Sequence, residues 1–154
     1  EGVDLVLTRD VDWFEAHRAG AAFRFRRCVA GGVVDPYGNR WECAGDPGTL
    51  DLTPQANVIA FGAYPNALER IEGYFITDRA ADVAVSLAPT FDLQDSSGGH
   101  QKYGDHGSLH ETDSVVPVIT SEPLRFGGSP PRTIDVAPAI VQYLLQSLSA
   151  AANG

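Results

Sequence analysis

The segment from Gly104 to Asp113 gathers the potential metal ligands of this sequence into one short stretch. It reads Gly-Asp-His-Gly-Ser-Leu-His-Glu-Thr-Asp and contains two imidazoles and three carboxylates. Such a cluster is unfavourable in solvation and charge unless a metal ion or a charged substrate compensates it. Imidazole together with carboxylate suits zinc, manganese or iron. The candidate ligands in and beside this segment are His100, Asp105, His106, His110, Glu111 and Asp113.

Of these candidates, His106 is the one that the sequence singles out. Asp105 and His106 are neighbours, and in an extended segment their side chains would point to opposite sides, so one histidine is a better prediction than the pair. Glycines lie close to His106 on both sides, and an apolar run follows. His100 and His110 are interpreted as solvated loop residues, because loops are usually exposed. For His106 itself, the residues alone leave a metal ligand and a solvated group both open.

No nucleophile is recognisable around this segment. The chain has no Gly-x-Ser-x-Gly elbow, no cysteine with an evident histidine partner and no glycine-rich phosphate cradle. Ser108 lies beside His106 but has no identifiable base and orienting acid, so we interpret it as a turn residue.

Length and composition set the outer bounds. The chain has 154 residues, of which 44% are hydrophobic and 20% charged, which fits one globular domain with a real core. Its formal net charge of -9 argues against a protein that binds a nucleic-acid groove. It does not exclude a metal enzyme acting on phosphate esters, because a bound cation reverses the local field. No apolar run is long enough to span a bilayer and no signal peptide is visible, so the compartment stays unknown.

Two features of the chain leave alternatives open. The sequence contains no methionine and begins at Glu1, shortly before an expected strand, so we expect a C-terminal piece of a longer protein or a processed product. The alternative is a natural chain whose initiator was removed. Cys28 and Cys43 flank an expected hairpin and could form a cross-strand disulfide or stay as two buried free thiols.

The first half of the sequence predicts mainly strands. Val3–Leu7 is short and apolar, and Ala22–Arg26 alternates apolar and basic residues with the period of a strand. Turn-forming residues at Asp35–Asn39 separate two further strand candidates. We therefore expect a small antiparallel β section over residues 22–52. Trp13–Ala16 is expected to form a short helical turn capped by Asp12.

The second half predicts strands alternating with helices. A helix is expected from Pro65, with an apolar inner face and with Arg70 among the residues outside. Asp82–Ala88 and Val115–Ile119 are apolar enough to be buried strands, and a Leu-rich helix capped by Thr133 or Asp135 should pack inward. This alternation indicates an α/β fold with a layered sheet and flanking helices, forming one domain over residues 1–154.

The same half carries a series of motifs in a fixed order. They are His106-Gly107-Ser108-Leu109, then Asp113, then Val116-Pro117-Val118-Ile119, then Thr133-Ile134-Asp135-Val136-Ala137-Pro138. This series resembles the C-terminal end of the alkaline-phosphatase superfamily, most closely its type I phosphodiesterase and nucleotide pyrophosphatase branch. The stretch Ala81–Pro89 is similar to the strand that leads into the late His-Gly motif of that branch. The resemblance covers residues 64–146, whereas residues 1–52 fit loosely.

The resemblance implies a function for a larger protein. Members of the branch hydrolyse phosphate esters with two divalent metals, usually zinc, and a metal-bound Thr or Ser nucleophile. The late histidine, here His106, completes the shell of one metal. The other ligands and the nucleophile lie upstream in the family, so a chain with this one ligand should be inactive alone and should work with an N-terminal part of the same protein. Sulfatases and phosphomutases share the fold, and a non-catalytic interaction module is the rival interpretation.

Overall fold

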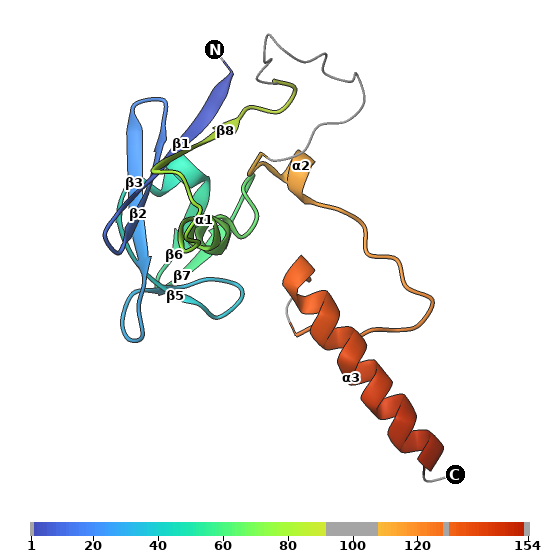
Figure 1. The fold of residues 1–154 in the computed structure, drawn as a ribbon. Coiled ribbons are helices and arrows are strands. Elements are labelled where there is room, and N and C mark those ends of the chain that lie inside the picture. Colours follow the sequence, from blue (N-terminus) through green and yellow to red (C-terminus); the bar gives the residue numbers. More distant parts are fainter. Residues whose placement is uncertain (1, 92–107, 128–129, 153–154) are drawn as a thin grey trace. The chain divides into compact units, whose positions relative to one another are not determined.

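The structure is a computed structural model, and it describes residues 2–91, 108–127 and 130–152 (Figure 1). In this part, the chain is an α/β protein with one eight-stranded mixed sheet and few helices. The strands lie in the order β6-β7-β4-β5-β3-β2-β1-β8. The pairs are antiparallel apart from β4 and β7, which run parallel. The strands are β1 (Val3–Asp10), β2 (Trp13–Arg18), β3 (Ala21–Arg27), β4 (Val33–Val34), β5 (Arg40–Gly45), β6 (Leu52–Gln55), β7 (Val58–Phe61) and β8 (Val83–Leu87).

The described residues also form four helical elements: η1 (Pro47–Leu50), α1 (Ala67–Phe75), α2 (Glu111–Ser114) and α3 (Thr133–Ala152). The chain divides into two compact units, Glu1–Val115 and Val116–Gly154. The first unit contains the whole sheet, η1, α1 and α2, and the second contains α3. The single domain expected over residues 1–154 stays a prediction. The expected β section at 22–52 contributes β3, β4 and β5 to the larger sheet.

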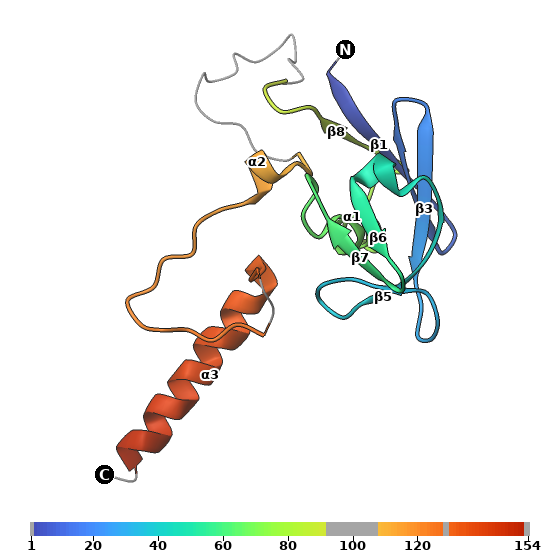
Figure 2. The same cartoon turned by 180° about the vertical axis from the view of Figure 1, so that it is seen from behind.

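The core of the first unit lies between one face of the sheet and α1 (Figures 1 and 2). Alternate residues of the first three strands point into it, as the period-two pattern of Ala22–Arg26 predicts. Helix α1 contributes Ala67, Leu68, Ile71 and Phe75, each at most 2% exposed. Tyr74 of the same helix is 45% exposed.

The expected helical turn at Trp13–Ala16 is wrong, because these residues belong to β2. Phe14 and Ala16 are buried and alternate with half-buried Glu15, which is the period of a strand. Phe14 lies opposite Phe25 in the register with β3. The connection to β3 is the pair Ala19 and Gly20, whose φ angles of 49° and 84° suit a tight hairpin turn.

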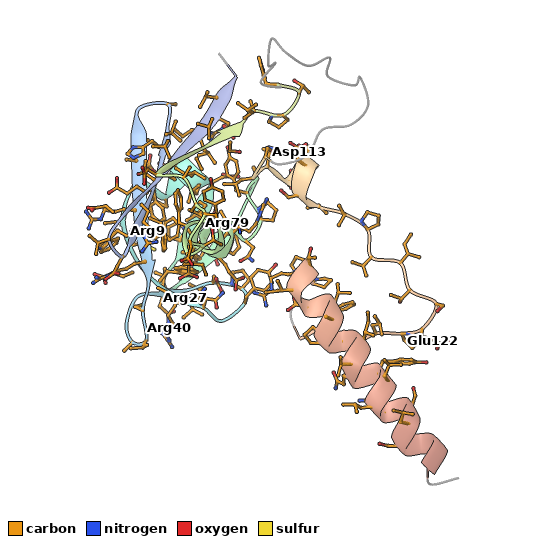
Figure 3. All side chains as sticks on the ribbon, viewed as in Figure 1. Arg9, Arg27, Arg40, Arg79, Asp113 and Glu122 are labelled. Atoms are coloured by element: carbon orange, nitrogen blue, oxygen red, sulfur yellow. The ribbon has the colours of Figure 1, made fainter. Side chains whose placement is uncertain are left out.

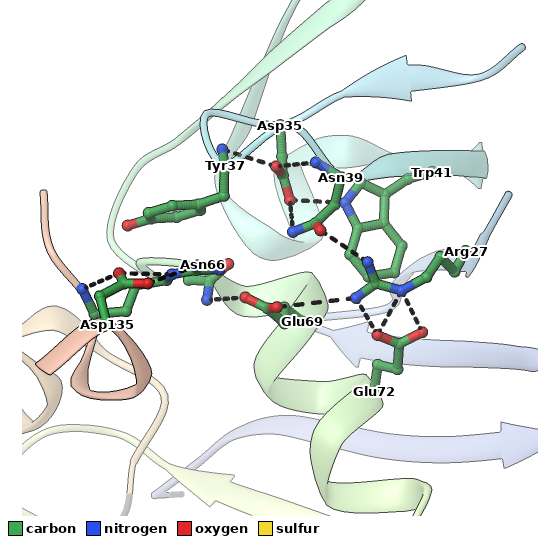
Figure 4. A network of polar contacts seen from close by, with 10 residues as sticks. Arg27, Asp35, Tyr37, Asn39, Trp41, Asn66, Glu69, Glu72 and Asp135 are labelled. Atoms are coloured by element: carbon green, nitrogen blue, oxygen red, sulfur yellow. Dashed lines mark hydrogen bonds and ion pairs between the residues drawn. The ribbon is translucent and has the colours of Figure 1, made fainter. Parts of the chain in front are cut away.

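A buried carboxylate organises the turn before β5, and it confirms the turn predicted at Asp35–Asn39 (Figure 4). Asp35 is 4% exposed. Its Oδ1 accepts hydrogen bonds from the backbone N–H groups of Tyr37 and Asn39, both at 2.9 Å. Its Oδ2 accepts a hydrogen bond of 2.8 Å from Nε1 of Trp41, a side chain with no exposed surface. The carboxylate thus satisfies the one polar group of the largest buried side chain.

Two arginines tie α1 to the sheet (Figure 3). Arg27 of β3 pairs with Glu72 of α1 and lies 4.6 Å from the centroid of the Trp41 ring. Its pKa is raised, chiefly by the hydrogen bond to Glu72. Arg9 of β1 donates from Nη1 to the carbonyl oxygen of Phe75, the last residue of the same helix, at 2.8 Å. The helix is therefore fixed by polar contacts as well as by its apolar face.

Two apolar segments are more exposed than the sequence predicts. Strand β8 was expected to be buried on both faces, but Val83 and Val85, which lie on the face opposite buried Ser86, are 52% and 47% exposed. Val115–Ile119 forms no strand, and its four aliphatic side chains are 46–89% exposed. Six large apolar side chains of α3 are 43–68% exposed: Ile134, Ile140, Val141, Leu144, Leu145 and Leu148. Ala139 of the same helix is buried, and the inward packing expected of the final helix stays a prediction.

Cys28 and Cys43 are both free, and each is half-buried. Of the two alternatives left open, the pair of thiols is the one present. Burial raises the pKa of the Cys43 thiol to about 12, with smaller contributions from Cys28 and Glu42. Cys43 is therefore a protonated, unreactive thiol near neutral pH.

Replacing Asp35 with alanine should lower the free energy of unfolding of the first unit by about 2–4 kcal/mol, because it leaves several donors without their buried acceptor. Urea unfolding followed by Trp fluorescence measures the change. Asp46→Ala is the matched control, since the Asp46 side chain accepts one bond, from the Gly48 N–H; it should lose about 1 kcal/mol. Equal losses in both variants would contradict the role given to Asp35.

The stability of the first turn of α3 should depend on pH. Hydrogen bonds from the Arg132 side chain and then its backbone hold the pKa of the Asp135 carboxyl below its ordinary value of 3.8. A depressed pKa stabilises the folded turn above that ordinary value, and the contribution is lost as the pH falls through the folded value. A ¹³C NMR titration should place the Asp135 midpoint below 3.8, and Arg132→Gln should raise it. A midpoint unmoved by Arg132→Gln would contradict this cause.

Candidate functional site

The candidate metal-binding segment ends in residues whose backbone is hydrogen-bonded to β8 and to the loop before α1. Ser108 is 8% exposed. The backbone N–H of Leu109 donates to Oγ of Ser86 in β8 at 3.0 Å. The backbone N–H of Glu111 donates to the carbonyl oxygen of Ala63 at 2.8 Å. The chain therefore rejoins the sheet at a defined place directly after the His106-Gly107 pair of the sequence.

Arg70 of α1 holds the same place from the helix side. Its Nη1 donates to the carbonyl oxygen of Leu109 at 2.9 Å, and its Nη2 donates to that of Ser108 at 3.2 Å. Nη1 also donates to the carbonyl oxygen of Pro65 at 3.3 Å. Burial lowers the pKa of Arg70, yet arginine stays charged in proteins. A guanidinium whose N–H groups donate to backbone carbonyls of two segments holds those segments together.

The sequence analysis missed Arg70 and Ser86. Arg70 was expected on the outer face of the helix, among solvated charges. Ser86 was expected only as one residue of an apolar strand. Their partners lie 38 and 23 residues away along the chain. The helical period gives the face of a side chain, but it does not reveal which distant carbonyl that side chain reaches.

His110 is a helix cap in this structure. It precedes α2, and its Nδ1 lies 3.3 Å from the backbone N–H of Thr112 and 3.0 Å from Oγ1 of the same residue. The rings of His110 and Tyr64 are nearly perpendicular, with an interplanar angle of 86° and centroids 5.8 Å apart. Ser108 Oγ accepts from the His110 N–H at 3.1 Å, which agrees with Ser108 as a turn residue. Because His110 is half-buried and its Nδ1 serves the cap, it is not the solvated loop residue that the sequence predicts, and it is a weak candidate ligand.

Tyr64 links this cap to the first strand. Its hydroxyl donates to Oδ2 of Asp4 at 2.6 Å, and Arg18 donates from Nε to Oδ1 of the same carboxylate at 3.0 Å. Burial, followed by the hydrogen bond to Asp4, holds the pKa of Tyr64 above its ordinary value. The phenol is therefore a permanent donor at physiological pH, which suits a structural bond.

The remaining candidates divide into two groups. Glu111 and Asp113 lie in the first turn of α2 and are exposed (Asp113 is labelled in Figure 3). Within residues 2–91, 108–127 and 130–152, no three His, Cys, Asp or Glu side chains gather closely enough to hold a metal ion. His100, Asp105 and His106 lie outside the described residues, so the metal-ligand role of His106 stays a prediction.

Comparison with known proteins adds no neighbour. No protein-family model, no curated protein and no solved structure matches the chain. In the described part of the chain, no helix is both long enough and apolar enough to cross a membrane.

Replacing Arg70 with glutamine should loosen the Ser108–Ser114 segment without unfolding the sheet, because the carbonyls of Ser108 and Leu109 lose their shared donor. Amide hydrogen exchange should become at least about 10-fold faster at Leu109 and Glu111, since losing a hydrogen bond to a charged group costs about 1.5–3 kcal/mol. Exchange in β3 and β5 should stay unchanged. Arg9→Gln, which also removes a guanidinium bonded to a carbonyl, is the control and should leave Leu109 and Glu111 protected. Unchanged exchange in Arg70→Gln would show that Arg70 is not a fastener.

Proposed function

We propose that this chain is the C-terminal part of a metal-dependent phosphohydrolase that cleaves phosphate monoesters or diesters. The motif series from His106 to Pro138 and the preceding strand support the proposal through their resemblance to the alkaline-phosphatase superfamily. In that assignment His106 provides one ligand to a divalent metal, with zinc as the expected ion. The metals polarise the phosphoryl oxygens and stabilise the leaving oxygen when they are bound.

The observation that carries the proposal is the double fastening of Ser108 and Leu109, by Ser86 of β8 and by Arg70 of α1. A metal ligand works best when its neighbours hold it in place, since a loosely held site loses geometry. The position that the resemblance gives to the ligand is two residues before this fixed point.

A catalytic zinc site also needs more ligands than the one that the resemblance identifies in this chain. A catalytic zinc needs about three protein ligands and an open position, so one histidine does not make a site. The proposal therefore assigns the nucleophile and the remaining ligands to an N-terminal part of the same protein, and it expects the isolated chain to be inactive. The acidic net charge of -9 is compatible with a phosphate ester because bound cations dominate the local field.

The test uses the longer protein, loaded with zinc, and follows the hydrolysis of p-nitrophenyl phosphate and bis(p-nitrophenyl) phosphate. His106→Ala should lower kcat/KM by more than about 100-fold, since even the partners of metal ligands are worth 10–100-fold. His110→Ala is the matched control: it removes a cap next to α2 and should keep most of the activity.

Three results would count against the proposal. If the longer protein hydrolyses neither ester, the phosphohydrolase assignment fails. If it hydrolyses p-nitrophenyl sulfate in their place, the protein is a sulfatase of the same fold. If His106→Ala and His110→Ala lose activity equally, His106 is not the ligand.

A further inference from the structure

A groove lies within the first unit, where two connections of the sheet and the end of α1 meet. Its volume is about 670 Å³, which is in the range of small-molecule sites. The turn between β1 and β2 contributes Val11 and Asp12, the segment after β3 contributes Val29, and the residue after α1 contributes Ile76. The residues that line the groove all belong to the first unit.

The lining of the groove includes large apolar side chains from several elements. Val11, Val29 and Ile76 are 75%, 99% and 66% exposed. Single exposed aliphatic side chains are ordinary on a protein surface, whereas several around one concavity are typical of a ligand site. Buried Phe14 lines the same groove. The groove therefore suits a ligand with an apolar body.

Val11 adopts an unfavourable backbone conformation at this place. Its φ of 53° lies in the left-handed region, which is exceptional for a β-branched residue. Tight hairpin turns with such angles favour asparagine, aspartate or glycine. Strained residues of this kind cluster at ligand-binding sites, where neighbouring contacts hold them. The strain is thus a second observation, independent of the concavity, that indicates a use for the Val11 side chain.

Arg9 provides the contact that holds Val11, and it brings a positive charge to the groove (Arg9 is labelled in Figure 3). Its Nε donates to the carbonyl oxygen of Val11 at 2.9 Å, and its Nη1 donates to that of Phe75. Arginine has more N–H donors than these two bonds use. In the described part of the chain, Arg9 forms no ion pair with a carboxylate. Its guanidinium is therefore fixed in place and can still donate to an anion.

The other charges of the groove limit the charge of that anion. Two ion pairs are part of the lining, Arg26 with Glu42 and Arg27 with Glu72. Exposed Asp12 adds a third carboxylate. Three carboxylates in the lining disfavour a dianion such as a phosphate monoester, because like charges repel. A singly charged anion meets less repulsion beside an arginine that is fixed by backbone carbonyls.

We propose that this groove binds a small aliphatic carboxylate, with its carboxylate on Arg9 and its chain against Val11, Val29 and Ile76. The planar guanidinium matches the geometry of a carboxylate. The aliphatic chain removes the apolar lining from water, which is the main favourable contribution to binding such a ligand. The inference goes beyond the proposed function and does not depend on it.

The test titrates octanoate into the 154-residue chain and follows the amide signals by ¹H–¹⁵N NMR. The signals of Val11, Val29 and Ile76 should shift. Arg9→Gln should weaken binding at least about 10-fold, because a hydrogen bond between two charged groups is lost. Val29→Glu, at a side chain that is 99% exposed and that the fold does not need, should weaken binding about 3-fold or more by repulsion. Val58→Glu on β7 is the matched control and should bind octanoate as the unsubstituted chain does.

Octylamine and octyl phosphate test the charge of the ligand. Octylamine should not bind, and octyl phosphate should bind more weakly than octanoate. Octylamine that binds as tightly as octanoate would overturn the proposal, and so would octyl phosphate that binds more tightly. Signals of the groove that do not shift with octanoate would overturn it as well. The same holds for an affinity that neither Arg9→Gln nor Val29→Glu changes.

Discussion

The packing of Trp41 under a helix is the constraint on which the rest of the first unit depends. Its ring is fully buried and meets Phe25 edge-on at 5.7 Å, and its Nε1 needs an acceptor that water cannot supply there. Asp35 provides that acceptor and shapes the turn before β5 in doing so. Arg27 lies over the same ring and pairs with Glu72, so the position of the tryptophan also determines where α1 lies.

From α1 the dependence continues to the candidate site. Arg70 extends from this helix to the carbonyls of Ser108 and Leu109, and Tyr64, just before the helix, supports the ring of His110. The segment that follows the predicted metal ligand is thus held through α1 by contacts that start at Trp41. A substitution in the core under α1 would therefore disturb the site without touching any residue in it.

The parts of this arrangement that follow from short-range pattern could be predicted, and the parts that follow from tertiary contact could not. The alternation in Ala22–Arg26 and the turn residues at Asp35–Asn39 are local signals, and both predictions are confirmed. Trp13–Ala16 was misread because its flanking Asp and Gly suit a helix as well as a hairpin. For Arg70 the sequence gives a helical position and no information on a partner almost forty residues away. The metal-ligand role of His106 remains a prediction from the motif.

The pairing of β1 with β8 has a consequence for folding. β1, β2 and β3 are joined by tight turns and can pair as soon as each has been synthesised, because their contacts are local. β1 can pair with its second partner, β8, only after α1 and the following loop have been synthesised, because Val6 pairs with Val85. During synthesis the outer side of β1 is therefore an open strand edge for most of the time that the sheet takes to emerge. That interval, in which a nascent sheet can pair with the wrong strand, is the stage at which a chaperone would matter most to this protein.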